Sequence, residues 1–311
     1  MELLLKAEKP SNRTTMLFRC TAIVALITQT VVALTPTAHT PDGRLVYAVP
    51  SGSRIKQKST DMLVFAPNGT LIHTFQNVIP KGAGTKPSLD KRQELSSTMA
   101  STSFTPSVEN LLQSFNTTFV VPPAPATFDS QIIYFSSSVS VLHPTTGVRF
   151  GNAKAAIQYG GSWLYGTGPF WTYALLVEIP DGHVLQAITD EKITVEVGQK
   201  IESTIFSDAE FNEEAPGLFW YIASLPSVSN TTYLEVGWEV PPSVAALQLE
   251  EEGVFQASHY PPGPFVFDHI NLNMTHDNPA VSWSTSGDLD TNAAVNVDVD
   301  GAKDARVSLV F

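Results

Sequence analysis

The chain has 311 residues, a formal net charge of −12 at pH 7 and a single cysteine. Such an acidic chain is not expected to bind nucleic acid, whose phosphates attract basic surfaces, and one cysteine forms no disulfide framework. The sequence contains no Gly-x-Ser-x-Gly elbow, no His-Glu-x-x-His motif and no phosphate-binding loop, which excludes the common serine hydrolases, zinc proteases and P-loop enzymes.

The N-terminal region is typical of a secretory signal peptide. Met16 precedes an apolar run from Cys20 to Ala33, which is too short to span a bilayer because that requires about 20 apolar residues. Val31, Val32 and Ala33 form a small-residue cleavage pattern. We expect translation to start at Met16 and cleavage to follow Ala33. An uncleaved anchor is disfavoured, and the protein is predicted to be extracellular and free of the membrane, without cysteine.

Two further patterns fit the secretory route. Sequons for N-glycosylation follow the signal at four asparagines, Asn68, Asn116, Asn230 and Asn273, and each predicts a glycan at a surface position. A Lys91-Arg92 pair follows a stretch that contains Pro and Gly, and it precedes the polar run 93–103. We interpret this pair as a processing site in an exposed linker.

The charge changes sign across this pair. Residues 34–92, the basic segment, hold eight Lys or Arg and three Asp or Glu, a balance of +5, whereas residues 93–311, the acidic domain, hold six and twenty-five, a balance of −19. Opposite charges attract, and acid protonates carboxylates. One hypothesis is that the basic segment covers the domain near neutral pH and leaves it in acid. The alternative is a folding aid or a solubilising leader.

The basic segment is predicted to form a small β unit. Apolar runs at 44–49, 61–66 and 70–75 have strand composition, and Pro67, Asn68 and Gly69 separate the last two as in a β-hairpin.

The acidic domain is predicted to be an all-β antiparallel sandwich. Runs rich in Val, Ile, Phe, Tyr and Thr recur between Pro- and Gly-rich turns, at 117–121, 131–142, 155–159, 170–178, 192–206, 218–224, 232–240, 245–254, 265–274 and 293–300. Short strands at such intervals indicate a sandwich or barrel. Residues 108–115 are predicted as one short helix.

No cofactor and no metal is expected. The five histidines of the acidic domain are scattered, mostly in or beside loops, and the aspartates of 288–300 alternate with apolar residues as on a strand with one wet face. Glu235 and Glu239 lie four residues apart on a predicted strand. That spacing is about 13 Å, which exceeds the usual separation of a glycosidase pair, so we interpret them as polar residues on an exposed face.

The order of the strands resembles that of the fungal glutamic peptidases, the scytalidoglutamic peptidase-like family. The matching motifs are Phe119-Val-Val-Pro122, Ala155-Ala-Ile-Gln-Tyr-Gly160, the aromatic strand from Phe170 to Tyr173, Ile193-Thr-Val-Glu-Val-Gly-Gln-Lys-Ile201, and Ala246-Leu-Gln-Leu-Glu250. They cover residues 116–274. The chain also resembles uncharacterised secreted fungal proteins of concanavalin A-like type that carry the same Gln-Tyr-Gly and Leu-Glu strands.

The resemblance implies a concanavalin A-like pair of curved sheets with a cleft on the concave face, and acid endopeptidase activity on a polypeptide. Gln158 and Glu250 occupy the positions of the family's catalytic glutamine and glutamate. The glutamate would act as general base on a water molecule, and the glutamine would hold that water and stabilise the oxyanion. Glu250 begins an acidic triplet with Glu251 and Glu252, so the sequence leaves open which carboxylate faces the cleft.

A second function is a non-catalytic or carbohydrate-binding, lectin-like sandwich at a cell wall or host surface. Its candidate aromatic residues are Trp163, Tyr165, Trp171, Tyr173 and Trp238. The same rings could bind a peptide substrate, for which Trp163, Trp171 and Tyr173 are the candidates, or pack in the core. The expected partners are therefore a polypeptide or glycan and the chain's own basic segment.

Overall fold

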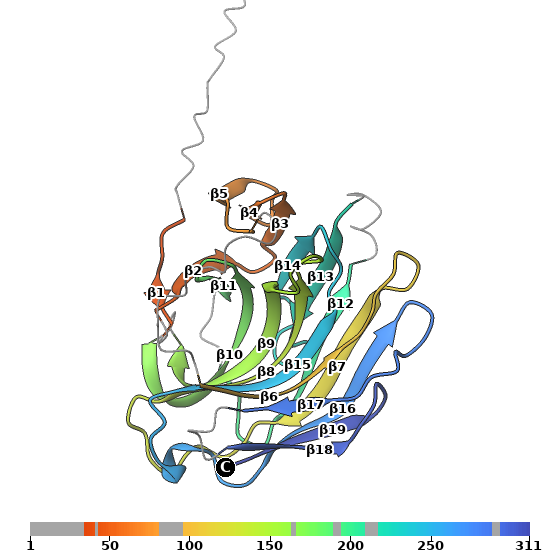
Figure 1. The fold of residues 1–311 in the computed structure, drawn as a ribbon. Helices are drawn as coiled ribbons and strands as arrows, with labels where there is room; N and C mark the ends of the chain where they lie inside the picture. The colour runs from red at the N-terminus through yellow and green to blue at the C-terminus, as the bar shows by residue number, and fades with distance from the viewer. Residues whose placement is uncertain are drawn as a thin grey trace, which may run out of the picture. The chain divides into compact units, whose positions relative to one another are not determined.

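Two large β-sheets make up the part of the chain that the structure describes (Figure 1). The computed structural model describes residues 34–40, 43–80, 96–162, 166–188, 194–208, 217–287 and 293–311, all within one compact unit, Val31–Phe311. The signal peptide and Ala33, the Lys91-Arg92 pair, Trp163 and Tyr165 lie outside these residues. Within them, the one helix is a 3-10 turn at Ala257–His259, and no helix is long and apolar enough to cross a membrane.

The first sheet has nine strands among the described residues, and its long strands β9 and β10 curve strongly (Figure 1). In spatial order its strands are β1 (Ala38–His39), β2 (Leu45–Pro50), β11 (His183–Ile188), β10 (Gly166–Ile179), β9 (Arg149–Ser162), β8 (Ile132–Leu142), β15 (Val244–Glu252), β6 (Ser96–Ser103) and β17 (Ser284–Ser286).

The second sheet has ten strands in the same described part of the chain. In spatial order they are β18 (Ala294–Val299), β19 (Ala305–Val310), β16 (Phe265–Met274), β7 (Leu112–Val120), β12 (Lys200–Ser207), β13 (Phe219–Ser224), β14 (Tyr233–Trp238), β3 (Arg54–Lys58), β4 (Asp61–Phe65) and β5 (Leu71–Phe75).

The core lies between the two sheets. Strand residues alternate between faces, so in β16 every second side chain is buried over most of the strand. Phe135 of the nine-stranded sheet stacks on Phe265 of the ten-stranded sheet with ring centroids 3.8 Å apart, and both rings are buried. These contacts confirm the all-β antiparallel sandwich predicted from the sequence.

The strands of the basic segment belong to both sheets. β2 extends the nine-stranded sheet beside β11, and β3 extends the ten-stranded sheet beside β14 (Figure 1). The predicted hairpin forms: β4 pairs with β5, Asn68 Oδ1 accepts a hydrogen bond from the Thr70 N–H at 3.0 Å, and Gly69 has φ of 81°.

Two local predictions were wrong. Residues 108–115 form no helix, because the chain enters β7 at Leu112 and this strand pairs on both sides, with β12 and β16. The polar run 93–103 is not all linker: residues 96–103 form β6 between β15 and β17. Strands β1, β3, β11, β17 and β19 were not predicted either.

Candidate functional site

Gln158 and Glu250 lie on the same face of the nine-stranded sheet. Gln158 of β9 is the register partner of Tyr134 in β8, and Tyr134 is the register partner of Glu250 in β15. Directly paired residues on neighbouring strands point to the same side. Neighbouring strands are about 4.8 Å apart, so two strand spacings place the backbones of Gln158 and Glu250 about 10 Å apart.

This face is opposite to the core. The neighbours Ile157, Tyr159 and Leu249 point between the sheets and are no more than 1% exposed. Glu251 also lies on the other side of β15 from Glu250, where its Oε1 accepts a hydrogen bond from the Tyr260 hydroxyl at 2.7 Å. The structure therefore places Glu250, and not Glu251, on the face of Gln158, and Glu252, two residues further along β15, follows the same alternation as Glu250.

The Gln158 side chain is fully buried, and neither its amide nitrogen nor its amide oxygen has a hydrogen-bond partner among the described residues. Gln186 Oε1 and Ser136 Oγ, which the register places on the same face, are also buried without a partner there. A buried polar group without a hydrogen bond costs about 1–3 kcal/mol. Such groups commonly mark functional sites, so this face has an unused capacity to bind polar groups.

A chain of ion pairs crosses the same face. Lys154 Nζ lies 2.7 and 2.8 Å from the two carboxylate oxygens of Glu250, and 2.8 Å from Glu178 Oε1. Arg44 Nη1 of the basic segment lies 2.7 Å from the same Glu178 oxygen. The Lys154 side chain is only 2% exposed. Buried charges persist when they are paired, and this network pairs two carboxylates with two cations.

Glu178 is the electrostatic centre of the network. Burial alone would raise the pKa of its carboxyl group, but the charges of Lys154 and Arg44 and their hydrogen bonds outweigh that effect and hold the pKa well below its usual range. Asn152 Nδ2 donates a further hydrogen bond to Glu178 Oε2 at 3.1 Å. The Glu178 carboxyl group therefore stays ionised to lower pH than an ordinary glutamate.

The contact with Lys154 does not use all the hydrogen-bond acceptor positions of the Glu250 carboxylate. A carboxylate has about four acceptor positions on its two oxygens, and Lys154 occupies one on each oxygen. The remaining positions can accept hydrogen bonds from a water molecule. The amide of Gln158 offers both a donor and an acceptor on the same face.

Apolar side chains lie among these polar groups and connect the face to the basic segment. A second apolar cluster, separate from the main core, contains Tyr134, Leu176 and, from β2, Val46. Arg44 and Val46 of the basic segment thus both reach the face that carries Gln158 and Glu250.

Sequence reasoning missed Lys154, Glu178 and Arg44. Lys154 interrupts an otherwise small and apolar strand, with Ala153, Ala155 and Ala156 around it. Lys154 lies four residues before Gln158, so alternation along the strand places the two side chains on the same side. This charged residue in an apolar strand was the available signal. Its carboxylate partners could not be deduced without the strand order.

Trp171, Tyr173 and Trp238, three of the aromatic residues proposed to bind a ligand, do not line this face. Trp171 and Tyr173 lie in the core cluster between the sheets at 2% and 7% exposure, and Trp238 is fully buried there too. Trp171 packs beside Phe135, and the Tyr173 hydroxyl donates a hydrogen bond to Thr232 Oγ1. Rings at this depth pack against other core residues and are not available to stack on a ligand, so the core-packing interpretation fits their placement.

Glu235 and Glu239 were expected on an exposed face. Glu239 is exposed, but Glu235 is only 5% exposed because β3 covers its strand and Arg54 Nε lies 2.7 Å from its carboxylate. Burial raises the pKa of Glu235 more than the contacts with Arg54 lower it. The expectation was wrong for Glu235.

The predicted glycan acceptors differ in accessibility. Asn68 and Asn230 are exposed at turns. Asn116 and Asn273 are half-buried on neighbouring strands, and the Nδ2 atom of each donates a hydrogen bond to Ser114 Oγ. A glycan attached at either of these two nitrogens would have to replace that contact.

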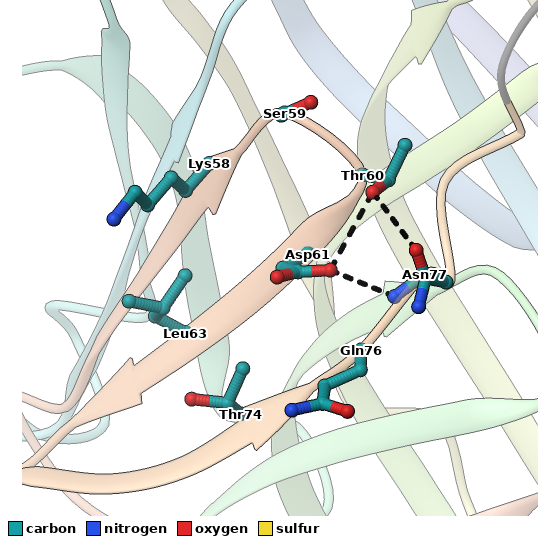
Figure 2. A pocket seen from close by; sticks show the side chains of 8 residues that line it. All are labelled: Lys58, Ser59, Thr60, Asp61, Leu63, Thr74, Gln76 and Asn77. Carbon is teal, nitrogen blue, oxygen red and sulfur yellow. Dashed lines mark hydrogen bonds between the residues drawn. The ribbon is translucent and has the colours of Figure 1, made fainter.

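A hollow of about 440 Å³ lies elsewhere, on the β3–β4–β5 strands of the basic segment. Figure 2 shows Asp61 at its centre, where the carboxylate accepts hydrogen bonds from the Asn77 backbone N–H at 2.8 Å and from Thr60 Oγ1 at 3.5 Å. Thr60, Asp61 and Asn77 are hydrogen-bonded to one another there, and we assign the hollow no function. Among the described residues, no three His, Cys, Asp or Glu side chains are grouped so as to hold a metal ion.

The chain is similar in structure to solved proteins but not in sequence to known families. No protein-family model matches the chain, and no curated protein matches it in sequence. The fold is similar to the solved structure of SCP-B, described as a member of the Eqolisin family of peptidases in a complex with the tripeptide Ala-Ile-His. The TM-score is 0.42 and the sequence identity 10%, over 70% of this chain and 98% of that one. A similarity this low assigns no role to any residue here.

Proposed function

We propose that this chain is a secreted acid endopeptidase of the glutamic type, with Glu250 as general base and Gln158 as the residue that holds the attacking water. The observation that supports the proposal best is the shared face: Gln158 and Glu250 flank Tyr134 in register, and the buried Gln158 amide has no partner among the described residues. No comparable observation favours the carbohydrate-binding alternative.

The chemistry follows from the two groups. Glu250 accepts a proton from water as the water oxygen attacks the peptide carbonyl carbon, and the Gln158 amide N–H donates to the oxyanion that forms. Glu250 then returns the proton to the peptide nitrogen, the carbon–nitrogen bond breaks, and the amine leaves. Lys154 contacts both oxygens of Glu250 and fixes the position of the carboxylate that accepts this proton.

Access to this pair requires a change in the chain. Gln158 is fully buried and Glu250 is 8% exposed. The expected cleavage after Arg92 lies five residues before Ser97, the register partner of Glu250 in β6. Cleavage would free the chain end next to the strand that carries Glu250. We therefore expect the uncleaved chain to be inactive and the cleaved chain to be active.

The proposal is tested by hydrolysis of denatured casein at pH 2–6, with pepstatin added to silence aspartic peptidases. The protein is assayed before and after complete cleavage at Lys91-Arg92. We expect Glu250→Gln and Gln158→Ala each to lower kcat by at least about 100-fold, the usual scale for acid–base and oxyanion groups.

The matched control is Glu251→Gln, the same chemical change one residue away on the opposite face of β15. Its amide oxygen can still accept the Tyr260 hydrogen bond, so activity is expected to remain within a few-fold of wild type. A cleaved, folded wild type without activity would refute the proposal, and so would equal effects of Glu250→Gln and Glu251→Gln.

A further inference from the structure

The basic segment joins both sheets of the sandwich by backbone pairing. β2 pairs with β11 over six residues, from Leu45 opposite His183 to Pro50 opposite Ile188, and β3 pairs with β14 at Arg54, Ile55 and Lys56. These are the two parallel pairings among the described strand pairs, and all others are antiparallel. The segment is thus built into the sheets and is not a separate cover.

The same strands supply core side chains. Many apolar residues of the segment are at most 7% exposed and belong to the apolar clusters that hold the acidic domain together: Val46, Tyr47, Val49, Ile55, Met62, Val64, Phe75, Val78 and Ile79. Phe75 packs against His183 of β11 with ring centroids 4.8 Å apart, and the Tyr47 hydroxyl lies 3.3 Å from His183 Nδ1. An interface whose buried centre consists of apolar side chains is typical of a permanent association.

Ion pairs and hydrogen bonds also connect the basic segment to each of the two sheets. At the nine-stranded sheet Arg44 pairs with Glu178, which also holds Lys154. At the ten-stranded sheet Arg54 pairs with Glu235, and the Ser59 N–H donates to Glu239 Oε1 at 2.6 Å.

Loss of the segment would leave two unpaired edges. Without β2, strand β11 would become the edge of one sheet, and without β3, strand β14 would become the edge of the other. β14 carries Val236 and Trp238, both fully buried. Long apolar edges with open backbone groups are unfavourable and prone to aggregation.

We propose that residues 34–80 remain bound after cleavage at Lys91-Arg92, so that the processed protein is a two-chain sandwich in which the basic segment is a permanent subunit. This inference concerns assembly and does not depend on peptidase activity. It replaces the hypothesis that acid releases the segment.

Acid weakens some of these contacts but leaves most of them. The pKa of Glu178 is held well below its usual range, so its pair with Arg44 persists to lower pH than an ordinary glutamate would allow. As the pH falls, Glu235 is protonated before Glu178, because burial, and to a lesser extent the charge of Asp208, raises the pKa of Glu235. The Arg54–Glu235 pair is therefore lost before the Arg44–Glu178 pair. Burial also lowers the pKa values of His73 and His183, which opposes their protonation inside the interface. The apolar contacts do not titrate.

The experiment uses the full chain with a specific protease site in place of Lys91-Arg92. After complete cleavage, shown on a denaturing gel, the protein is passed through a gel-filtration column at pH 7 and at pH 4. We expect both fragments to elute together in a 1:1 ratio at both pH values and to separate only in denaturant. A basic segment that elutes on its own at either pH would overturn the inference.

Hydrogen exchange on the same sample gives a second measurement. The backbone amides of β11 and β14 are expected to keep their protection from exchange after cleavage, because β2 and β3 remain paired with these strands. A rise of more than tenfold in their exchange rates on cleavage would contradict the proposal. The sensitivity control is the cleaved Val49→Ala, Ile55→Ala variant, in which two buried side chains of the segment are shortened. Its segment should dissociate on dilution with a Kd at least tenfold higher than that of the cleaved wild type.

Discussion

Replacement of Lys154 by methionine removes the ammonium group that both Glu178 and Glu250 contact. Glu178 keeps its pair with Arg44, so the loss falls mainly on Glu250, whose side chain is 11% exposed. Removal of one partner of a buried ion pair costs about 3–5 kcal/mol. For a domain of this size about 1 kcal/mol shifts Tm by about 2–4 °C, so we expect Tm to fall by roughly 6–20 °C at pH 7.

The loss of stability caused by Lys154→Met is expected to be smaller in acid than at pH 7. In the wild type the folded pKa of Glu178 lies below its unfolded value of 4.5, so its stabilising contribution is complete above that pH and is lost as the pH falls through the lower folded value. In Lys154→Met the charge that lowers the pKa of Glu178 most is gone while burial still raises it, so acid protonates this carboxyl group more readily and relieves the penalty. The gap between wild type and variant should therefore fall to less than about half between pH 7 and pH 3.

Denaturant unfolding followed by tryptophan fluorescence measures this gap. Trp171, Trp220, Trp238 and Trp283 are all buried, so their emission reports exposure of the core. The matched control is Lys200→Met, at an exposed position of β12, which should change stability by no more than about 0.5 kcal/mol. A Lys154→Met penalty below about 1 kcal/mol, or one that is equal at pH 7 and pH 3, would refute the electrostatic argument.

Two further predictions concern backbone strain and pH. A Cβ at Gly160, where φ is 98°, would lie 2.1 Å from the Gln131 carbonyl oxygen, so Gly160→Ala should cost more than about 2 kcal/mol in denaturant unfolding. Gly263→Ala, with φ of 81° and open space around it, should cost only about 1 kcal/mol, and equal costs would contradict the clash. Burial lowers the pKa values of His73 and His183, so their contribution is present above pH 6.5 and is lost as the pH falls through the folded values. His73→Phe should therefore lose less Tm than wild type between pH 7 and pH 5, and identical losses would show that His73 does not titrate in the fold.

Local composition was a good guide to the strands and turns. The runs at 131–142, 265–274 and 218–224 correspond closely to β8, β16 and β13, because β-branched and aromatic residues suit a pleated, half-buried surface. It failed where pairing overrides composition. The polar run that contains β6 is a strand because β15 and β17 pair with it on both sides.

The sequence identified Gln158 and Glu250 individually, but it could not show that they lie close together on one face. Alternation along a strand states that Gln158 and Lys154 share a side, and that Glu250 and Glu251 do not. It cannot state that β8 lies between β9 and β15, and only this order brings Gln158 and Glu250 to one face. For the same reason the sequence placed Trp171 among substrate-binding candidates, whereas the structure places it in the core.

By itself the sequence determined the fold class, the strand-forming runs and the contrast between a basic segment and an acidic domain, since these depend on composition and on a period of two residues. Tertiary structure alone decided which charges meet. Lys154, Glu178 and Glu250 come from three strands and Arg44 directly precedes a fourth, β2, and strand order brings them into one network. It also decided that the basic segment completes both sheets, because pairing between strands far apart in the chain leaves no local signal.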